Sequence, residues 1–311
     1  MTNRDIGTNL KKEFTATALL CMTLIYGLML SGEVGEYVKD GMRLAVECVV
    51  PTALPFMIVS DVYVCYGRPE RIRWLKMWFE SVFGLPGCGL AAFICGNISG
   101  FPIGAKMTSD LYRSGMLKRG DAQRLAALSN NPSCAFIVGG VGMGIYGDAR
   151  LGFLLLISVY SATVLCGIIT RKKRDKSDFA YINSEQKYDF IESVKTAGLS
   201  SVSIISFISI FSGINGIIKK RIKYAPALYL FSAVSEVTNA VKIFSSEAHL
   251  SDCLSLSLTA FALGFGGVCV GLQSSVFTVA AGLKMKNYYL IKLMEGILAC
   301  GIFALLFITI K

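Results

Sequence analysis

One stretch of the chain reads Ser99-Gly100-Phe101-Pro102-Ile103-Gly104-Ala105-Lys106, and it decides how the rest of the sequence is interpreted. It follows an apolar run, residues 85–98, that is too short to cross a bilayer, because a spanning helix needs about 20 residues. A related stretch in the second half reads Ser235-Glu236-Val237-Thr238-Asn239-Ala240-Val241-Lys242. Paired, interrupted apolar segments in two halves are the signature of a transporter-type binding site near the membrane midplane.

Each copy of this motif is followed by a second break in an apolar stretch. In the first half the break is Asn130-Asn131-Pro132, where proline removes an N–H group and disrupts a helix. In the second half it is the glycine-rich run 264–267, followed by Gln273-Ser274-Ser275. We therefore expect each half to contain one broken helix and one hairpin. The hairpin is expected at residues 84–111 in the first half and at residues 225–245 in the second.

The composition is that of a polytopic membrane protein. Hydrophobic residues make up 53% of the chain and charged residues 17%, whereas a soluble domain has about 25% charged residues. The net charge of +10 lies mainly in loops, where membrane topology and anionic lipid explain it better than nucleic acid does. The bilayer is thus the expected partner, and the ten cysteines, with no C-x-x-C pair, are expected to be buried hydrophobes.

The order of the apolar segments predicts an all-α polytopic membrane protein with two inverted repeats. Each repeat has three crossings and a re-entrant hairpin, so the odd number of crossings makes the second repeat enter from the opposite side. One extra N-terminal span, residues 14–30, precedes the two repeats. The first half also contains an amphipathic stretch (33–47) and a membrane-surface helix with Trp74 and Trp78.

The expected crossings are residues 48–66, 119–146, 151–170, 198–218, 254–283 and 293–310. The expected domains are an N-terminal helix (1–31), a first repeat (32–170), a basic cytoplasmic linker (171–194) and a second repeat (195–311). The basic run 219–223 departs from the positive-inside rule in this arrangement.

The breaks supply the candidate substrate site. A helix that starts near Ala105 would direct its free N–H groups at the cavity, where they favour an anionic group. Lys106 would add a full positive charge there, unless its side chain reaches past the apolar surface to water. The amides at the second break could instead be ordinary helix caps. The expected substrate-binding residues are Ser99, Gly100, Gly104, Ala105, Lys106, Asn130, Asn131, Ser133, Asn239, Gln273, Ser274 and Ser275.

Glu236 is the candidate for a coupling ion. An ionisable group inside a membrane is a functional candidate by default, and the i, i+3 spacing predicts that Glu236 shares a helical face with Asn239. A proton or a sodium ion could bind there. The alternative is a structural ion pair with a cation such as Lys242. No organic cofactor and no metal site are expected.

Enzymatic chemistry has no support in the sequence. There is no Ser/His/Asp set, no H-E-x-x-H and no P-loop, and His249, the only histidine, lies in a polar loop. Residues 142–147 match G-x-G-x-x-G, but no strand precedes them, so the glycines are expected to serve helix packing. We therefore expect neither an enzyme nor a primary pump.

Several motifs together resemble the nucleoside-recognition, or Gate, family of membrane proteins. They are residues 99–106, Asp110-Leu111-Tyr112, Gly115, residues 130–132, Val141-Gly142-Met143 and residues 236–239, and the resemblance extends over roughly 35–310. The family is distantly similar to concentrative nucleoside transporters, so the resemblance implies a minimal version of that core. Sporulation members are associated with moving dipicolinate from the mother cell across the outer forespore membrane. The resemblance thus implies an endospore-former, a small anionic aromatic substrate and a location in the outer forespore or cell membrane.

Three functions follow as hypotheses. The first is a secondary carrier of a small anion, which the resemblance identifies as dipicolinate. The second is a carrier of a nucleoside or another neutral solute with the same fold. The third is a non-transporting receptor or scaffold in spore formation. Each is compatible with a homo-oligomer.

Overall fold

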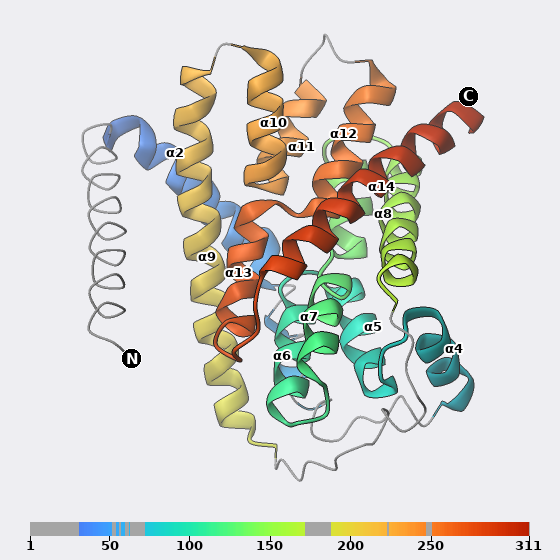
Figure 1. Cartoon of the computed structure of the whole chain (residues 1–311). Helices are drawn as coiled ribbons and strands as arrows, with labels where there is room; N and C mark the ends of the chain where they lie inside the picture. Colours follow the sequence, from blue (N-terminus) through green and yellow to red (C-terminus); the bar gives the residue numbers. More distant parts are fainter. Residues whose placement is uncertain are drawn as a thin grey trace, which may run out of the picture.

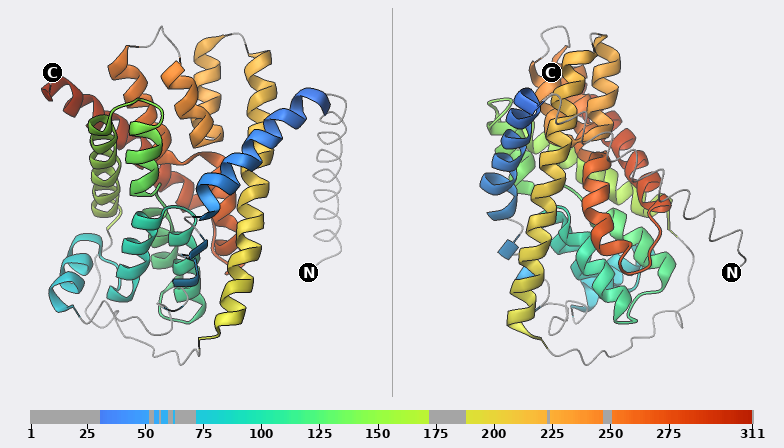
Figure 2. Two further views of the ribbon diagram at one scale, coloured as in Figure 1. Left: turned by 180° about the vertical axis from the view of Figure 1, so that it is seen from behind. Right: turned by 90° about the vertical axis from the view of Figure 1, so that its left-hand side faces the viewer.

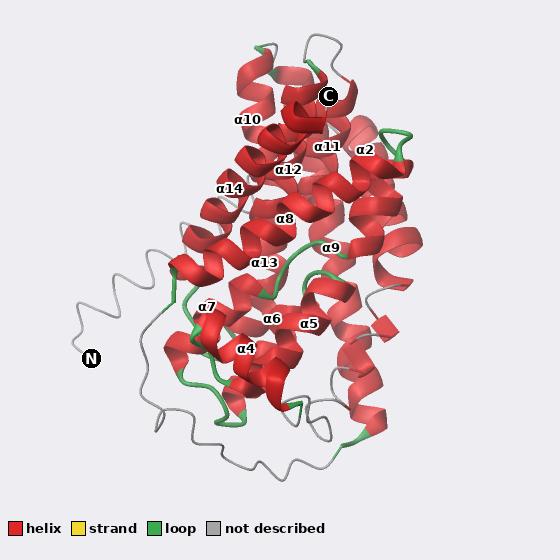
Figure 3. Cartoon of the chain, turned by 90° about the vertical axis from the view of Figure 1, so that its right-hand side faces the viewer, coloured by secondary structure: helices red, strands yellow, loops and turns green. Residues whose placement is uncertain are grey.

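Helices make up most of the described chain. The computed structural model describes residues 31–51, 54–55, 57–59, 62, 72–171, 188–222, 224–246 and 251–310. No strand occurs in these ranges, and Figure 3 shows helices joined by short loops. The expected all-α class is confirmed for this part of the chain. The expected span 14–30, about half of residues 48–66 and His249 lie outside it.

Four candidate membrane spans occur in the described ranges. They are α8 (Ala149–Ile169), α9 (Phe190–Arg221), α12 and α13 taken together (Asp252–Thr278), and α14 (Lys286–Ile310). A fifth would consist of α4 (Arg73–Phe83) with the segment Gly87–Ser99, but these two are bent by 99°. This chain is therefore an integral, multi-pass membrane protein.

Two helical hairpins lie at opposite ends of the molecule (Figure 1). The first consists of α5 (Leu90–Ser99) and α6 (Ile103–Arg113), and the second of α10 (Ala225–Ser235) and α11 (Val237–Ser246). Each arm has 10 or 11 residues, about half of what a bilayer crossing needs. Both hairpins turn at the two motif copies, as the sequence predicts. That the halves are inverted repeats, with the domain boundaries given above, stays a prediction.

A broken helix follows each hairpin. After α6, α7 (Arg119–Leu128) ends shortly before Asn130-Asn131-Pro132, and the chain resumes as a π-helical segment, η4 (Phe136–Met143). After α11, α12 (Asp252–Phe265) meets α13 (Gly267–Thr278) at Gly266 and Gly267, which both have φ +77°. Glycine adopts this left-handed backbone without the steric cost that a side chain would add.

The amphipathic segment after residue 30 forms α2 (Ser31–Leu44), continued by η1 (Ala45–Val49). Figure 2 shows α2 leaning across α9. A side chain at Gly41 would meet Ser212 Cβ at 2.6 Å, and one at Gly216 would meet the Tyr37 ring at 2.2 Å, so small residues let these helices approach closely. The helix α9 begins eight positions before the expected residue 198, because Asp189 caps it by accepting hydrogen bonds from Ile191 N at 2.9 Å and Glu192 N at 3.2 Å.

Two further elements of the fold are the surface helix α4 and the last helix, α14. Trp74 on α4 is 71% exposed and Trp78 is also exposed, which fits the expected surface helix. The short helix η3 (Gly87–Gly89) joins α4 to the first hairpin. The last helix, α14, packs one face against α12, α8 and α7, while Leu293 and Ile297 on its other face are exposed.

Candidate functional site

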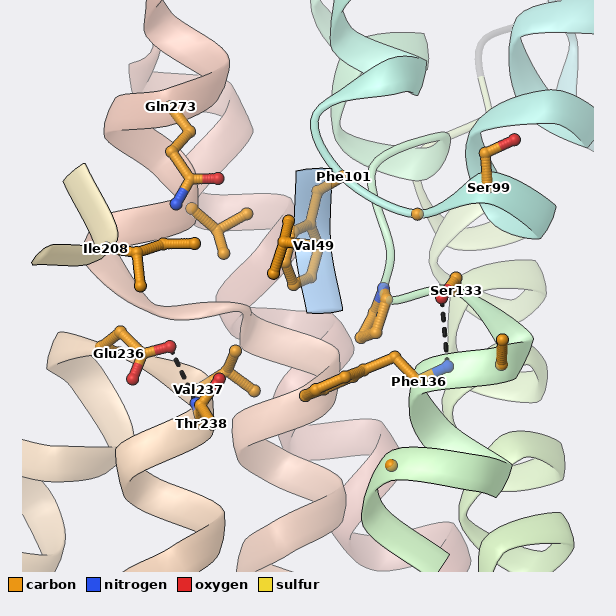
Figure 4. Close-up of a pocket in the computed structure, with 15 residues that line it drawn as sticks. Val49, Ser99, Phe101, Ser133, Phe136, Ile208, Glu236, Val237, Thr238 and Gln273 are labelled. Carbon is orange, nitrogen blue, oxygen red and sulfur yellow. Dashed lines mark hydrogen bonds between the residues drawn. The ribbon is translucent and has the colours of Figure 1, made fainter. Parts of the chain in front are cut away.

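A cavity of about 240 Å³ lies where the breaks of the two halves meet (Figure 4). Its wall includes residues 99–101 from the first motif copy and residues 236–238 from the second. The break before η4 adds Pro132 and Ser133, and α13 adds Gln273. The other lining residues are Val49, Ala135, Phe136, Gly140, Ile208 and Val270, so most of the wall is apolar.

A glycine brings the hairpin break and the helix break into contact in each half. Gly100, at the turn of the first hairpin, has φ +88°, and a Cβ atom there would lie 2.8 Å from Ser133 N. In the second half the glycine is in the broken helix instead, because a Cβ atom on Gly267 would lie 2.9 Å from Ser235 O. The two halves therefore close the cavity wall by the same type of contact.

Gly104 is packed against the end of α7. A Cβ atom on Gly104 would lie 1.9 Å from Ser129 O, and one on Gly96 would lie 2.1 Å from the same atom. Gly104 was expected to bind substrate, but it does not line the cavity. Its place in the motif is explained by the close approach of α5, α6 and residue 129.

Glu236 lines the cavity and caps α11. It has extended backbone angles, φ −154° and ψ 129°, between α10 and α11. Its Oε1 accepts a hydrogen bond from Thr238 N at 2.9 Å, and its Oε2 accepts bonds from Asn239 N at 2.8 Å and Asn239 Nδ2 at 2.9 Å. The expected proximity to Asn239 is confirmed, but it arises from a helix cap and not from a shared helical face. Among the described residues no ion pair joins Glu236 to Lys242, which is exposed.

Lys106 is buried in an ion pair. Its side chain is 4% exposed, its Nζ lies 3.2 Å from Asp110 Oδ2, and it does not line the cavity. The side chain thus neither reaches the cavity wall nor extends to the surface. Of the described lining residues, Glu236 alone carries a charge.

The amides of the first broken helix bind other protein groups. Asn130 Nδ2 donates to Ser274 Oγ at 2.8 Å and to Tyr288 OH at 2.7 Å, so two expected site residues contact each other away from the cavity. Asn131 Nδ2 donates to Asn97 Oδ1 at 2.8 Å and to Thr163 Oγ1 at 3.0 Å. Of the expected residues, those that line the cavity are Ser99, Gly100, Ser133, Gln273 and Glu236, and those that do not are Gly104, Ala105, Lys106, Asn130, Asn131, Asn239, Ser274 and Ser275.

A buried ion pair on α14 is the feature that the sequence analysis missed. Lys292 Nζ lies 3.0 Å from Glu295 Oε2, and the two side chains are 1% and 0% exposed. Thr163 Oγ1 donates a hydrogen bond to Glu295 Oε1, and Lys292 Nζ donates to Asn131 Oδ1 at 2.5 Å. The signal was present, because two ionisable residues in an apolar helix are a functional candidate. The expected span began at residue 293 and so left Lys292 outside the apolar segment.

Metal binding finds no support in the described ranges. They hold no group of three or more His, Cys, Asp or Glu side chains placed to bind a metal ion. The cysteines that the structure describes are free thiols, buried or partly buried: Cys88, Cys95, Cys134, Cys166, Cys253, Cys269 and Cys300. This agrees with their expected role as small hydrophobes.

Comparison with known proteins identifies one informative relative. The chain is 26% identical to the sporulation integral membrane protein YlbJ of Bacillus subtilis (strain 168), over 85% of this chain and 75% of that protein. No protein-family model matches the chain, and no solved structure matches it. The chain is therefore a multi-pass membrane protein related to a sporulation membrane protein, and its place in the Gate family stays a prediction.

Proposed function

We propose that this chain is a secondary carrier that binds a small solute in the cavity between the two hairpin breaks and moves it across the membrane. The observation that supports this most is that both motif copies line one cavity. The two hairpins lie at opposite ends of the molecule, and the turn of each lines the cavity, which suits a carrier because each could open the cavity toward one side. The solute is moved without chemical change, so the proposal includes no enzymatic activity.

The cavity suits a small solute with an aromatic ring. Its volume, about 240 Å³, is somewhat below the range of small-molecule sites, which are about 300–1,000 Å³, so it suits only a small solute. The rings of Phe101 and Phe136 supply apolar walls, and Gln273 supplies an amide. The Ser99 hydroxyl is buried and points away from the other lining residues in Figure 4, so we do not expect it to contact a solute.

Dipicolinate is the leading substrate, and the outer forespore membrane is the proposed location. The relationship to a sporulation membrane protein supports the setting. The carboxylate of Glu236 opposes binding of a dianion in the same cavity, because like charges repel strongly where water is scarce. We propose that a proton or a sodium ion binds at Glu236 together with dipicolinate and removes this repulsion.

A neutral solute, such as a nucleoside, is the second candidate. The specific observation is that the described lining residues include a carboxylate and no cation. A neutral solute meets no repulsion from Glu236 and can donate hydrogen bonds to it. Its uptake would then need no ion to neutralise the carboxylate.

Uptake by proteoliposomes separates these possibilities. We expect saturable uptake of labelled dipicolinate that rises with a proton or sodium gradient, and weaker uptake of labelled uridine. Gradient-independent uptake of uridine alone would favour the neutral solute. Binding without uptake of either compound would contradict a carrier and favour a receptor or scaffold.

A paired substitution tests whether the cavity is the site. Thr238→Leu adds apolar volume at the cavity wall, so we expect it to abolish uptake while the protein still inserts. Ser81→Leu is the matched control, because Ser81 is exposed on α4 outside the cavity. Equal uptake by both variants would mean that the solute takes another path.

A further inference from the structure

A fully buried ion pair contacts Asn131, the residue before the cavity wall, in a part of the protein that the proposed carrier mechanism does not use. Lys292 and Glu295 are one turn apart on α14. Glu295 accepts a hydrogen bond from Thr163 on α8, and Lys292 donates one to Asn131 in the break after α7. The pair thus joins the last helix to the first broken helix.

Asn131 connects four elements of the fold. Its Nδ2 donates to Asn97 Oδ1 on α5 at 2.8 Å, to Leu128 O on α7 at 3.3 Å and to Thr163 Oγ1 on α8 at 3.0 Å. Its Oδ1 accepts from Lys292 Nζ on α14. The side chain is fully buried, and its amide nitrogen and oxygen are both bonded.

The next two residues form part of the cavity wall. Pro132 and Ser133 follow Asn131 directly and line the cavity. A second contact holds the same segment, because Tyr160 OH donates to Pro132 O at 3.3 Å and also to Asn97 O. The first-half wall is therefore held from two sides, by Asn131 next to Pro132 in the chain and by Tyr160 from α8.

Stability alone does not explain a buried ion pair here. Removing two charges from water is costly, and apolar residues of similar volume are often as stabilising or more so. What the charge adds is direction, since an ammonium group forms a short, charge-assisted hydrogen bond to a chosen acceptor. In this structure that acceptor is Asn131 Oδ1, at 2.5 Å.

We infer that Lys292 and Glu295 are a positioning pair. They hold Asn131, and through it the part of the cavity wall formed by Pro132 and Ser133, in a fixed position relative to α14. Neutralising the pair would release this wall while the second-half wall, residues 236–238, keeps its own hydrogen bonds. The geometric part of this inference is independent of transport. The part that concerns solute binding rests on the proposed carrier function.

The test measures each wall separately. Single cysteines at Ser133 or Thr238, in full-length protein without its native cysteines, are labelled with a small water-soluble thiol reagent. The neutralised variant is Lys292→Met with Glu295→Gln. The matched control is Glu192→Gln with Lys195→Met, an exposed pair on α9 with the same residue types and the same i, i+3 spacing.

We expect neutralisation to change the labelling rate at Ser133→Cys at least about tenfold, equivalent to about 1.4 kcal/mol. Labelling at Thr238→Cys should stay within about twofold, or about 0.4 kcal/mol, and the control pair should alter neither site. An unchanged rate at Ser133→Cys would overturn the inference. Equal changes at both sites would also overturn it, because they would indicate general loosening.

Two additions keep the test decisive. If the neutralised variant fails to insert, Asn131→Ala takes its place, since it leaves the ion pair intact and must still alter Ser133→Cys and spare Thr238→Cys. In uptake assays the neutralised variant should bind solute at least about tenfold more weakly. If the unaltered protein transports nothing, the carrier proposal fails, and the labelling result still decides the positioning role.

Discussion

Replacing Glu236 with glutamine tests the helix cap and the proposed ion coupling together. The carboxylate accepts three hydrogen bonds, one at Oε1 and two at Oε2. A glutamine amide offers one acceptor oxygen, so it can keep the two bonds from Asn239, and the Thr238 N–H group then loses its partner. The side chain size is nearly unchanged, so the effect comes from charge and hydrogen bonding.

The expected loss of stability follows from these contacts. The Thr238 N–H group is partly buried, so losing its acceptor costs up to about 1–3 kcal/mol. Removing a negative charge from the N-terminus of α11 costs about 0.3–1 kcal/mol more. We therefore expect the free energy of unfolding to fall by about 1–4 kcal/mol. Thermal unfolding in detergent measures this.

Uptake supplies the second measurement. Glutamine resembles the protonated acid, so the Glu236→Gln protein should still bind solute but lose the response of uptake to a proton or sodium gradient. The matched control is Asp189→Asn, because Asp189 caps α9 with two backbone hydrogen bonds on an exposed surface. It should lose about 1 kcal/mol or less and keep the gradient response. Gradient dependence that survives in a stable Glu236→Gln protein would refute the coupling role.

Three further predictions concern packing, charge and topology. Gly104→Ala should destabilise the protein by about 1–3 kcal/mol, because the new Cβ would lie 1.9 Å from Ser129 O. The control is Gly301→Ala on α14, where a new Cβ meets nothing within 4 Å, so it should be neutral or stabilise the protein by up to about 1 kcal/mol. Thermal unfolding compares the two variants. Lys106→Gln should leave solute affinity within about twofold in binding assays, because Lys106 pairs with Asp110 outside the cavity, and a loss of about tenfold would make it a substrate ligand after all. Cysteines placed in residues 171–190 and in residues 245–255 should be labelled from opposite sides of the membrane, since α9 begins at one end of the molecule and α12 at the other (Figure 1), and equal access from one side would rule out the inverted arrangement.

The breaks in the helices could be predicted because they depend on local covalent chemistry. Proline at positions 102 and 132 removes a backbone donor, and Gly100, Gly266 and Gly267 adopt positive φ angles that other residues avoid. The cavity residues that were predicted lie at or next to these breaks, as Ser99 and Ser133 do. Glu236 was predicted from its charge in an apolar segment.

The remaining part of the site depends on contacts between distant residues. Lys292 and Asn131 are 161 positions apart, so no local pattern shows that they meet. The i, i+3 spacing of Glu236 and Asn239 predicts proximity, but it does not distinguish a helix cap from a shared face. Gly104 belongs to the same motif as Gly100, yet its contact with Ser129 makes it a packing residue, and only the fold separates the two roles.

The central claim is that solute binds between the two motif copies, and protection from labelling tests it most directly. Single cysteines at Ser133 and at Thr238, which line the cavity from different halves, would be labelled in the presence and absence of dipicolinate or uridine. A cysteine at Ser81, exposed on α4, serves as the control. We predict that one of these solutes slows labelling at both cavity positions and leaves Ser81→Cys unchanged. Labelling of Ser133→Cys and Thr238→Cys that neither solute slows, in protein that takes up the solute, would contradict the account.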